Sequence, residues 1–158
     1  MTREDTIRYL NDLTETCKDG ELGYRTAAAD ARNTQLESVF SDYAKQRGHF
    51  AQALQAEVAR LGGTSTGSGT PTGTLFRGWI NLKSALTGGD GGALVAACET
   101  GEESAVGAFA LVANLDLTGA TKTLVEKQQR QIQEAHAHML RLKAEADGAH
   151  FQKNDQIA

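Results

Sequence analysis

The stretch GGTSTGSGTPTGTLFRGWINLKSALTGGDGG, residues 62–92, divides the chain into two halves and decides how they connect. Its first part is rich in Gly, Ser and Thr, a composition typical of a flexible linker. Its second part places Trp79, Leu82 and Leu86 on one face, which predicts a short helix over about residues 75–87. A connection of this length can run along a helical bundle and return the chain to its other end.

On both sides of this stretch, apolar residues recur at spacings of three and four, which is typical of amphipathic helices. The sequence predicts four long helices, over residues 2–32, 34–61, 93–114 and 119–146, followed by a polar tail over 147–158. Short connections join the first two and the last two helices, so each pair is expected to form an antiparallel hairpin. Two hairpins joined by one long crossover, residues 62–92, predict an all-α, ferritin-like four-helix bundle that occupies residues 1–146 as one domain.

The distribution of charged and apolar residues argues against a nucleic-acid partner and against a membrane partner. The formal net charge of −4 comes from scattered residues, and no basic stripe is present to follow a phosphate backbone. No apolar run approaches the roughly 20 residues that cross a bilayer. The first residues, MTREDTIRYL, lack the apolar segment of a signal peptide. We therefore expect a cytoplasmic protein without a nucleic-acid or membrane partner.

Two cysteines, Cys17 and Cys98, each fall on an apolar helix stripe and form neither a disulfide framework nor a metal motif. They are expected to be buried as small apolar side chains. With the long crossover, the first and third long helices run antiparallel. The two thiols then lie on opposite sides of the centre of the bundle, too far apart to form a disulfide.

Three segments carry a resemblance to a known family: LNDLTETCKDGELGYRTAAADA (residues 10–31), WINLKSALTGGD (residues 79–90) and CETGEESAVGAF (residues 98–109). Together they resemble a family of bacterial ferritin-like four-helix-bundle proteins known mostly as a domain of unknown function. The similarity covers about residues 5–115, and the last helix matches more loosely. The resemblance implies a fold and an ancestry, and it brings no established activity.

Several polar residues interrupt the apolar stripes of the predicted helices. A charge in a bundle core is costly unless it is paired or bound to metal. Five of these residues lie near the middles of their helices, so the sequence predicts that they converge in one central layer: Glu21, Arg47, Glu102, Gln129 and His136. Tyr24 and Tyr43 are expected as core rings whose hydroxyl groups join this layer. Glu57, by contrast, is expected near one end of the bundle.

Ferritin-like di-iron proteins hold their metal in such a layer, using one Glu from each of two helices and a Glu-x-x-His pair from each of the other two. Glu21 and Glu102 fit the single glutamates. The second helix offers only Gln46-x-x-His49, which has no carboxylate.

Two interpretations of this layer follow. In the favoured one, the Arg47 guanidinium bridges Glu21 and Glu102 in place of metal, with His136 or Gln129 beside it, and no cofactor is expected. In the alternative, Glu21, Glu102 and His136 bind iron or manganese, and the protein is a metal store or an oxidase.

The favoured function is that of a non-catalytic interaction or stress-associated protein that could form homo-oligomers. The short helix presents Phe76, Trp79 and Ile80. This face either covers the open side of the bundle or docks a partner or a second copy. A ligand site in the bundle interior is a third possibility, which rests on fold-level analogy.

Overall fold

A computed structural model describes residues 1–65, 78–86 and 90–157, with side chains described through residue 148. The elements in these ranges are helical: α1 Arg3–Asp30, α2 Thr34–Arg60, α3 Leu82–Ala85, α4 Gly91–Ala113 and α5 Gly119–Ile157. No strand occurs in the described ranges, so the expected all-α class is confirmed. In the same residues, no helix combines the length and the apolar character that a membrane span requires.

Polar caps fix where three of the long helices begin. The side chain of Thr2 accepts a hydrogen bond from the amide of Asp5, and Asn33 accepts from the amides of Gln35 and Leu36. Asp90 does the same for the amide of Gly92 at the start of α4. Each cap satisfies amide groups that have no partner within the first helical turn. α1, α2 and α4 begin and end close to their expected bounds.

Two elements differ from expectation. The short helix α3 covers only Leu82–Ala85, while residues 78–81 form turns, and residues 75–77 and 87 lie outside the described ranges. The helix α5 passes the expected end at residue 146 and continues to Ile157. The expected polar tail is therefore helical through Ile157, because it contains no proline and adding a residue to an existing helix costs far less than starting one.

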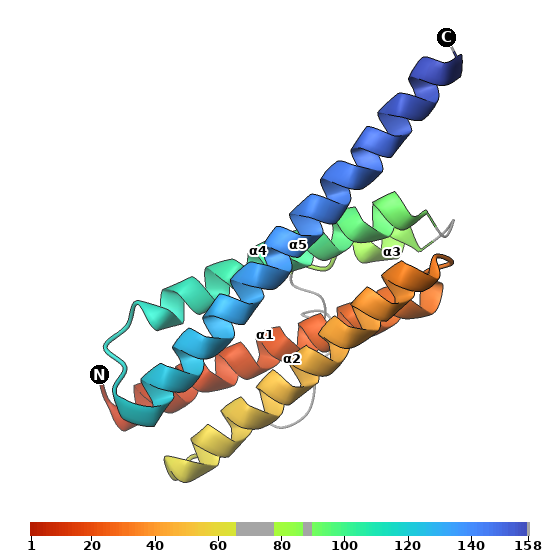
Figure 1. Ribbon diagram of the computed structural model, residues 1–158. Helices are drawn as coiled ribbons and strands as arrows, with labels where there is room; N and C mark the ends of the chain where they lie inside the picture. The colour runs from red at the N-terminus through yellow and green to blue at the C-terminus, as the bar shows by residue number, and fades with distance from the viewer. Residues whose placement is uncertain (66–77, 87–89, 158) are drawn as a thin grey trace.

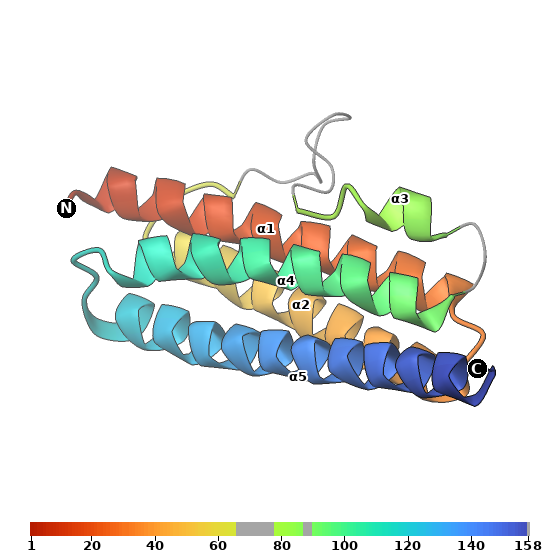
Figure 2. The same ribbon diagram turned by 90° about the horizontal axis from the view of Figure 1, so that it is seen from above.

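The four long helices form two hairpins (Figures 1 and 2). α1 packs along α2, α4 packs along α5, and the hairpins meet mainly where α1 contacts α4, while α2 and α5 contact each other less. In Figure 1, α1 and α5 run in one direction and α2 and α4 in the other. The chain between α2 and α4 therefore passes from one end of the bundle to the other, and α5 extends beyond the remaining helices.

The buried apolar residues form two clusters along the bundle. The first cluster includes Leu10, Leu13, Cys17, Phe50, Leu54, Val58, Phe109, Val112, Val125 and Ile132. The second includes Tyr24, Ala27, Phe40, Trp79, Leu82, Leu94, Val95, Cys98 and Met139. Burying one large apolar side chain stabilises a fold by roughly 1.5–3 kcal/mol, so these clusters provide most of the driving force for assembly.

Trp79 is a core residue of the second cluster, with 3% of its surface exposed. Its indole lies against two glycines, and a Cβ atom at Gly23 or Gly101 would stand only 2.4 or 2.2 Å from ring carbons. The ring also packs edge-on against Tyr24, with 5.0 Å between centroids. Glycines that weaken α1 and α4 locally thus create the slot that the indole fills.

This packing distinguishes the two roles expected for Trp79. Trp79 is buried, so it covers the side of the bundle and is not available to a partner. Ile80 is 78% exposed, whereas Phe76 lies outside the described residues.

Candidate functional site

A buried ion pair lies at the centre of the bundle. Arg47 is in the middle of α2 and Glu102 in the middle of α4, and the arginine Nη2 lies 2.6 Å from the glutamate Oε1. Their side chains are 1% and 0% exposed. At this distance and depth, the contact is a charge-assisted hydrogen bond shielded from solvent.

Tyr24 on α1 completes the cluster. Its hydroxyl donates a hydrogen bond to the same Oε1 of Glu102, and the Arg47 guanidinium carbon lies 5.7 Å from the centroid of its ring. Gln46 accepts a hydrogen bond from Nε of Arg47 at 3.3 Å. The second oxygen of Glu102, Oε2, is buried without a hydrogen-bond partner among the described residues. Three of the four long helices thus meet at this cluster.

A glycine makes room for the arginine. A Cβ atom at Gly20 would lie 3.3 Å from Cγ and 3.4 Å from Nη1 of Arg47. The absence of a side chain at Gly20 therefore lets α1 approach the stem of Arg47 closely. Gly20 lies inside α1, which runs as one helix from Arg3 to Asp30.

The surroundings fix the charges of the cluster. Burial by itself lowers the pKa of Arg47, but the attraction of Glu102 outweighs this effect and holds the pKa above its usual value. The pKa of the Tyr24 hydroxyl is raised, first by burial and then by the negative charge of Glu102. The cluster therefore holds a guanidinium cation and a neutral phenol that donates its hydrogen bond to Glu102.

Both cysteines lie near this centre without joining it. Cys17 and Cys98 are free and buried, as expected. Burial raises the pKa of Cys17 to about 12 and the pKa of Cys98 well above its usual value. Nucleophilic or metal-binding thiolates have lowered pKa values, so neither thiol is poised for such chemistry.

The other residues expected in the central layer lie elsewhere. Glu21 is 28% exposed at its side chain and pairs with Arg25 on the same helix, at 2.6 Å. His136 pairs with Glu99, with 3.2 Å between Nε2 and Oε1. Neither residue pairs with Arg47 or Glu102. The five predicted residues are thus divided among separate contacts, and only Arg47 and Glu102 meet.

These differences depend on which side of each helix faces the core. Successive residues of an α-helix are separated by about 100° around its axis, so a shift of one position moves a side chain off the core-facing stripe. Gln129 is only half-buried, and the fully buried glutamine of α5 is its neighbour Gln128, whose Nε2 donates to the carbonyl of Phe50 at 3.3 Å. Spacings of three and four do not distinguish adjacent stripes this closely.

Of the two tyrosines expected in the central layer, only one lies there. Tyr24 joins the central cluster as predicted, but the hydroxyl of Tyr43 lies 2.7 Å from Nδ1 of His138. Glu57 lies near one end of the bundle, where it bonds Arg60 on α2 and accepts a hydrogen bond from Thr121 on α5 at 2.6 Å. Sequence reasoning did not identify Glu99, Gln128 or His138 as contact residues, because each lies beside the predicted stripe.

The residues of the expected metal set are not assembled. Glu21, Glu102 and His136 make their contacts with three different partners. Over the described ranges, no group of three or more His, Cys, Asp or Glu side chains is placed to hold a metal ion. The residues at the centre therefore do not fit the di-metal pattern, because the carboxylate there, Glu102, is paired with a guanidinium.

A known protein family matches most of the chain. The model of a family described as "Domain of unknown function (DUF2383)" matches residues 5–114. This span runs from α1 to the end of α4 and includes Tyr24, Arg47 and Glu102. No curated protein is similar to the chain at a significant level.

Proposed function

The chain belongs to the family described as Domain of unknown function (DUF2383), and on that premise we propose that it is a non-catalytic, ferritin-like helical-bundle protein. In this proposal, a cluster of Arg47, Glu102 and Tyr24 replaces an ancestral di-metal centre. The protein then acts through contacts with partners or with a second copy, as an interaction or stress-associated protein.

The observation that carries the proposal is the buried Arg47–Glu102 pair. An arginine side chain stays protonated in proteins, so its positive charge is permanent. Two divalent cations bring four positive charges and are usually neutralised by about four carboxylates. In the described structure, the carboxylate at this position is already paired with a cation, and an incoming metal ion would meet the guanidinium.

The directions of the helices support the ferritin-like part of the proposal. Such folds join two antiparallel hairpins by one long connection that crosses the length of the bundle. Here α1 and α5 run opposite to α2 and α4 (Figure 1), and residues 61–90 connect the two hairpins. Di-iron members of that fold bind metal with side chains that project into the bundle core, and Arg47 and Glu102 likewise project into the core from facing helices.

Exposed apolar side chains are the positions through which we propose that the protein contacts a partner or a second copy. Ile80 is 78% exposed next to the buried Trp79, and Leu111 on α4 and Leu140 on α5 are 62% and 44% exposed. Single exposed apolar residues are common on soluble proteins, so these positions indicate candidate contacts without identifying a partner. A cytoplasmic location remains an expectation from the sequence.

Metal analysis of the purified protein tests the proposal. After expression in medium supplemented with iron or manganese, we expect substoichiometric metal by elemental analysis, because the guanidinium repels a second cation at the centre. Glu102→Gln removes the central carboxylate, and Glu103→Gln, at an exposed position on the same helix, is the matched control. Stoichiometric metal that disappears in Glu102→Gln and persists in Glu103→Gln would establish the metalloprotein and overturn the proposal.

A further inference from the structure

The boundary between α2 and α5 differs from the other boundaries of the bundle. These two helices contact each other less than α1 contacts α2 or α4 contacts α5. Among the described side chains, three polar contacts join them: Thr121 to Glu57 at 2.6 Å, Gln128 to the carbonyl of Phe50 at 3.3 Å, and Tyr43 to His138 at 2.7 Å. Polar contacts hold two helices at defined points, but they fill less space than interlocked apolar side chains.

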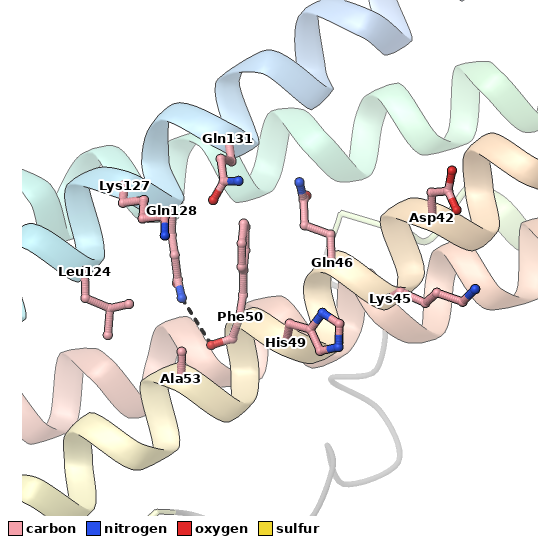
Figure 3. Close-up of a pocket in the computed structure, with 10 residues that line it drawn as sticks. All are labelled: Asp42, Lys45, Gln46, His49, Phe50, Ala53, Leu124, Lys127, Gln128 and Gln131. Atoms are coloured by element: carbon pink, nitrogen blue, oxygen red, sulfur yellow. Dashed lines mark hydrogen bonds between the residues drawn. The ribbon is translucent and has the colours of Figure 1, made fainter.

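The space left between the helices is a groove of about 520 Å³ (Figure 3). Its lining comes from the middle of α2 and the first half of α5: Asp42, Lys45, Gln46, His49, Phe50, Ala53, Leu124, Lys127, Gln128 and Gln131. Ligand sites in proteins commonly have volumes of about 300–1,000 Å³ with an apolar lining and a few polar groups. The groove has both the size and this mixture of surfaces.

Apolar and amide groups form the interior of the groove. Phe50, Ala53 and Leu124 give it an apolar surface, and in Figure 3 Gln46 and Gln131 extend toward each other from the two helices. Carboxamide groups donate and accept hydrogen bonds without carrying charge. A ligand between the helices could therefore bury an apolar body while the amides fix its orientation.

Charge and an unsatisfied acceptor define the ligand further. The groove is lined by two lysines, Lys45 and Lys127, against one acid, Asp42, although the whole chain carries a net charge of −4. Gln128 is only 2% exposed, and its Oε1 is buried without a hydrogen-bond partner among the described residues. A buried acceptor without a donor costs about 1–3 kcal/mol, and a ligand N–H or O–H group would recover this energy if the Gln128 amide turns toward the groove.

We propose that the groove between α2 and α5 binds a small aromatic acid. Its ring would lie over Leu124 and Ala53, its anionic group would meet Lys127, and an N–H or O–H group would face Gln128. Gln46 also bonds Arg47, so the ligand would sit one hydrogen bond away from the central ion pair. The site is separate from that pair, and it stands whether or not the pair replaces a metal centre.

Binding of 8-anilinonaphthalene-1-sulfonate tests the proposal, because this probe combines aromatic rings, a sulfonate and an N–H group. Isothermal titration calorimetry with the full chain should give saturable binding of one probe per chain. We expect Lys127→Glu to weaken the affinity by about tenfold or more, which corresponds to about 1.4 kcal/mol. Lys122→Glu is the control, since it makes the same charge change at an exposed position earlier on α5.

Two further measurements keep the test decisive. Backbone amide resonances of Ala53, Leu124 and Gln128 should shift on addition of the probe. The neutral analogue N-phenyl-1-naphthylamine should bind more weakly, because it lacks the anionic group. The proposal is overturned by a lack of saturable binding, by equal effects of the two lysine substitutions, by shifts confined to other residues, or by equally tight binding of the neutral analogue.

Discussion

Arg47 is the largest fully buried side chain among the described residues, and its charge cannot be removed by loss of a proton. Its position between Tyr24 and Glu102 therefore depends on those partners. A buried ion pair contributes little net stability, since removing two charges from water costs several kcal/mol per ion. What the pair does provide is a strong penalty against any arrangement that separates its members. We infer that it fixes how α2 and α4 face each other.

A double-mutant cycle at Arg47 and Glu102 measures this coupling. Arg47→Met and Glu102→Leu should each lower the free energy of unfolding by about 3–5 kcal/mol, because each leaves an unpaired charge in the core. The double variant should be more stable than either single variant, since no charge remains buried. Urea unfolding monitored by circular dichroism gives the three values. A double variant that loses the sum of the two single effects would contradict the coupling.

At the scale of the helices, the glycines of α1 and α4 are positions of close approach. Gly23 and Gly101 face the indole of Trp79, and Gly20 faces the stem of Arg47. Each glycine lowers helix propensity by about 1 kcal/mol relative to alanine, and the packing of a large side chain offsets that loss. Gly107 on α4 is different, because a Cβ atom there would meet nothing within 4 Å.

The contrast between two glycines of one helix gives a matched test. Gly101→Ala should destabilise the protein by about 1–3 kcal/mol, because the new methyl group overlaps the indole ring. Gly107→Ala should stabilise it by roughly 0.5–1 kcal/mol through the lower entropy of the unfolded chain. Thermal unfolding measures both changes.

The fluorescence of Trp79 serves as the local readout, since it is the only tryptophan in the chain. Its emission should shift to longer wavelength in Gly101→Ala, where the ring is displaced toward solvent, and should stay unchanged in Gly107→Ala. Equal stability of the two alanine variants would show that the indole does not depend on the slot.

At the scale of the whole molecule, the two hairpins meet around two apolar clusters with the ion pair near the centre. Cys17 on α1 belongs to the first cluster and Cys98 on α4 to the second. A disulfide requires Cα atoms within about 4.4–6.8 Å. The placement of the thiols in different clusters therefore reports on how the hairpins are arranged.

Thiol chemistry tests this arrangement. At pH 8 the native protein should react very slowly with a thiol reagent such as Ellman's reagent, because the pKa of Cys17, about 12, and the raised pKa of Cys98 leave almost no thiolate. Both thiols should react at once in concentrated guanidinium chloride. Mild oxidation of the native protein should leave them reduced. An intramolecular disulfide formed under native conditions would require a different arrangement of the helices.

Much of the architecture could be predicted from the sequence, because its causes are local. Apolar spacings of three and four mark each long helix, and Asn33 marks the start of α2. The short connections form the hairpins, and the length of residues 62–92 allows the chain to change ends. The predicted end of the last helix, at residue 146, was wrong. α5 continues to Ile157, because polar residues without proline permit a helix as readily as a tail.

By itself, the sequence determined that polar residues occur at the middles of the helices and that Arg47 needs an acidic partner in the core. Only the tertiary structure decided which partner it has. Glu21 turns to Arg25 and His136 to Glu99, while Glu102 faces Arg47. The physical reason is that the rotation of each helix about its axis is set by packing between helices. The indole of Trp79 between two glycines is such a contact, and residues distant in sequence create it.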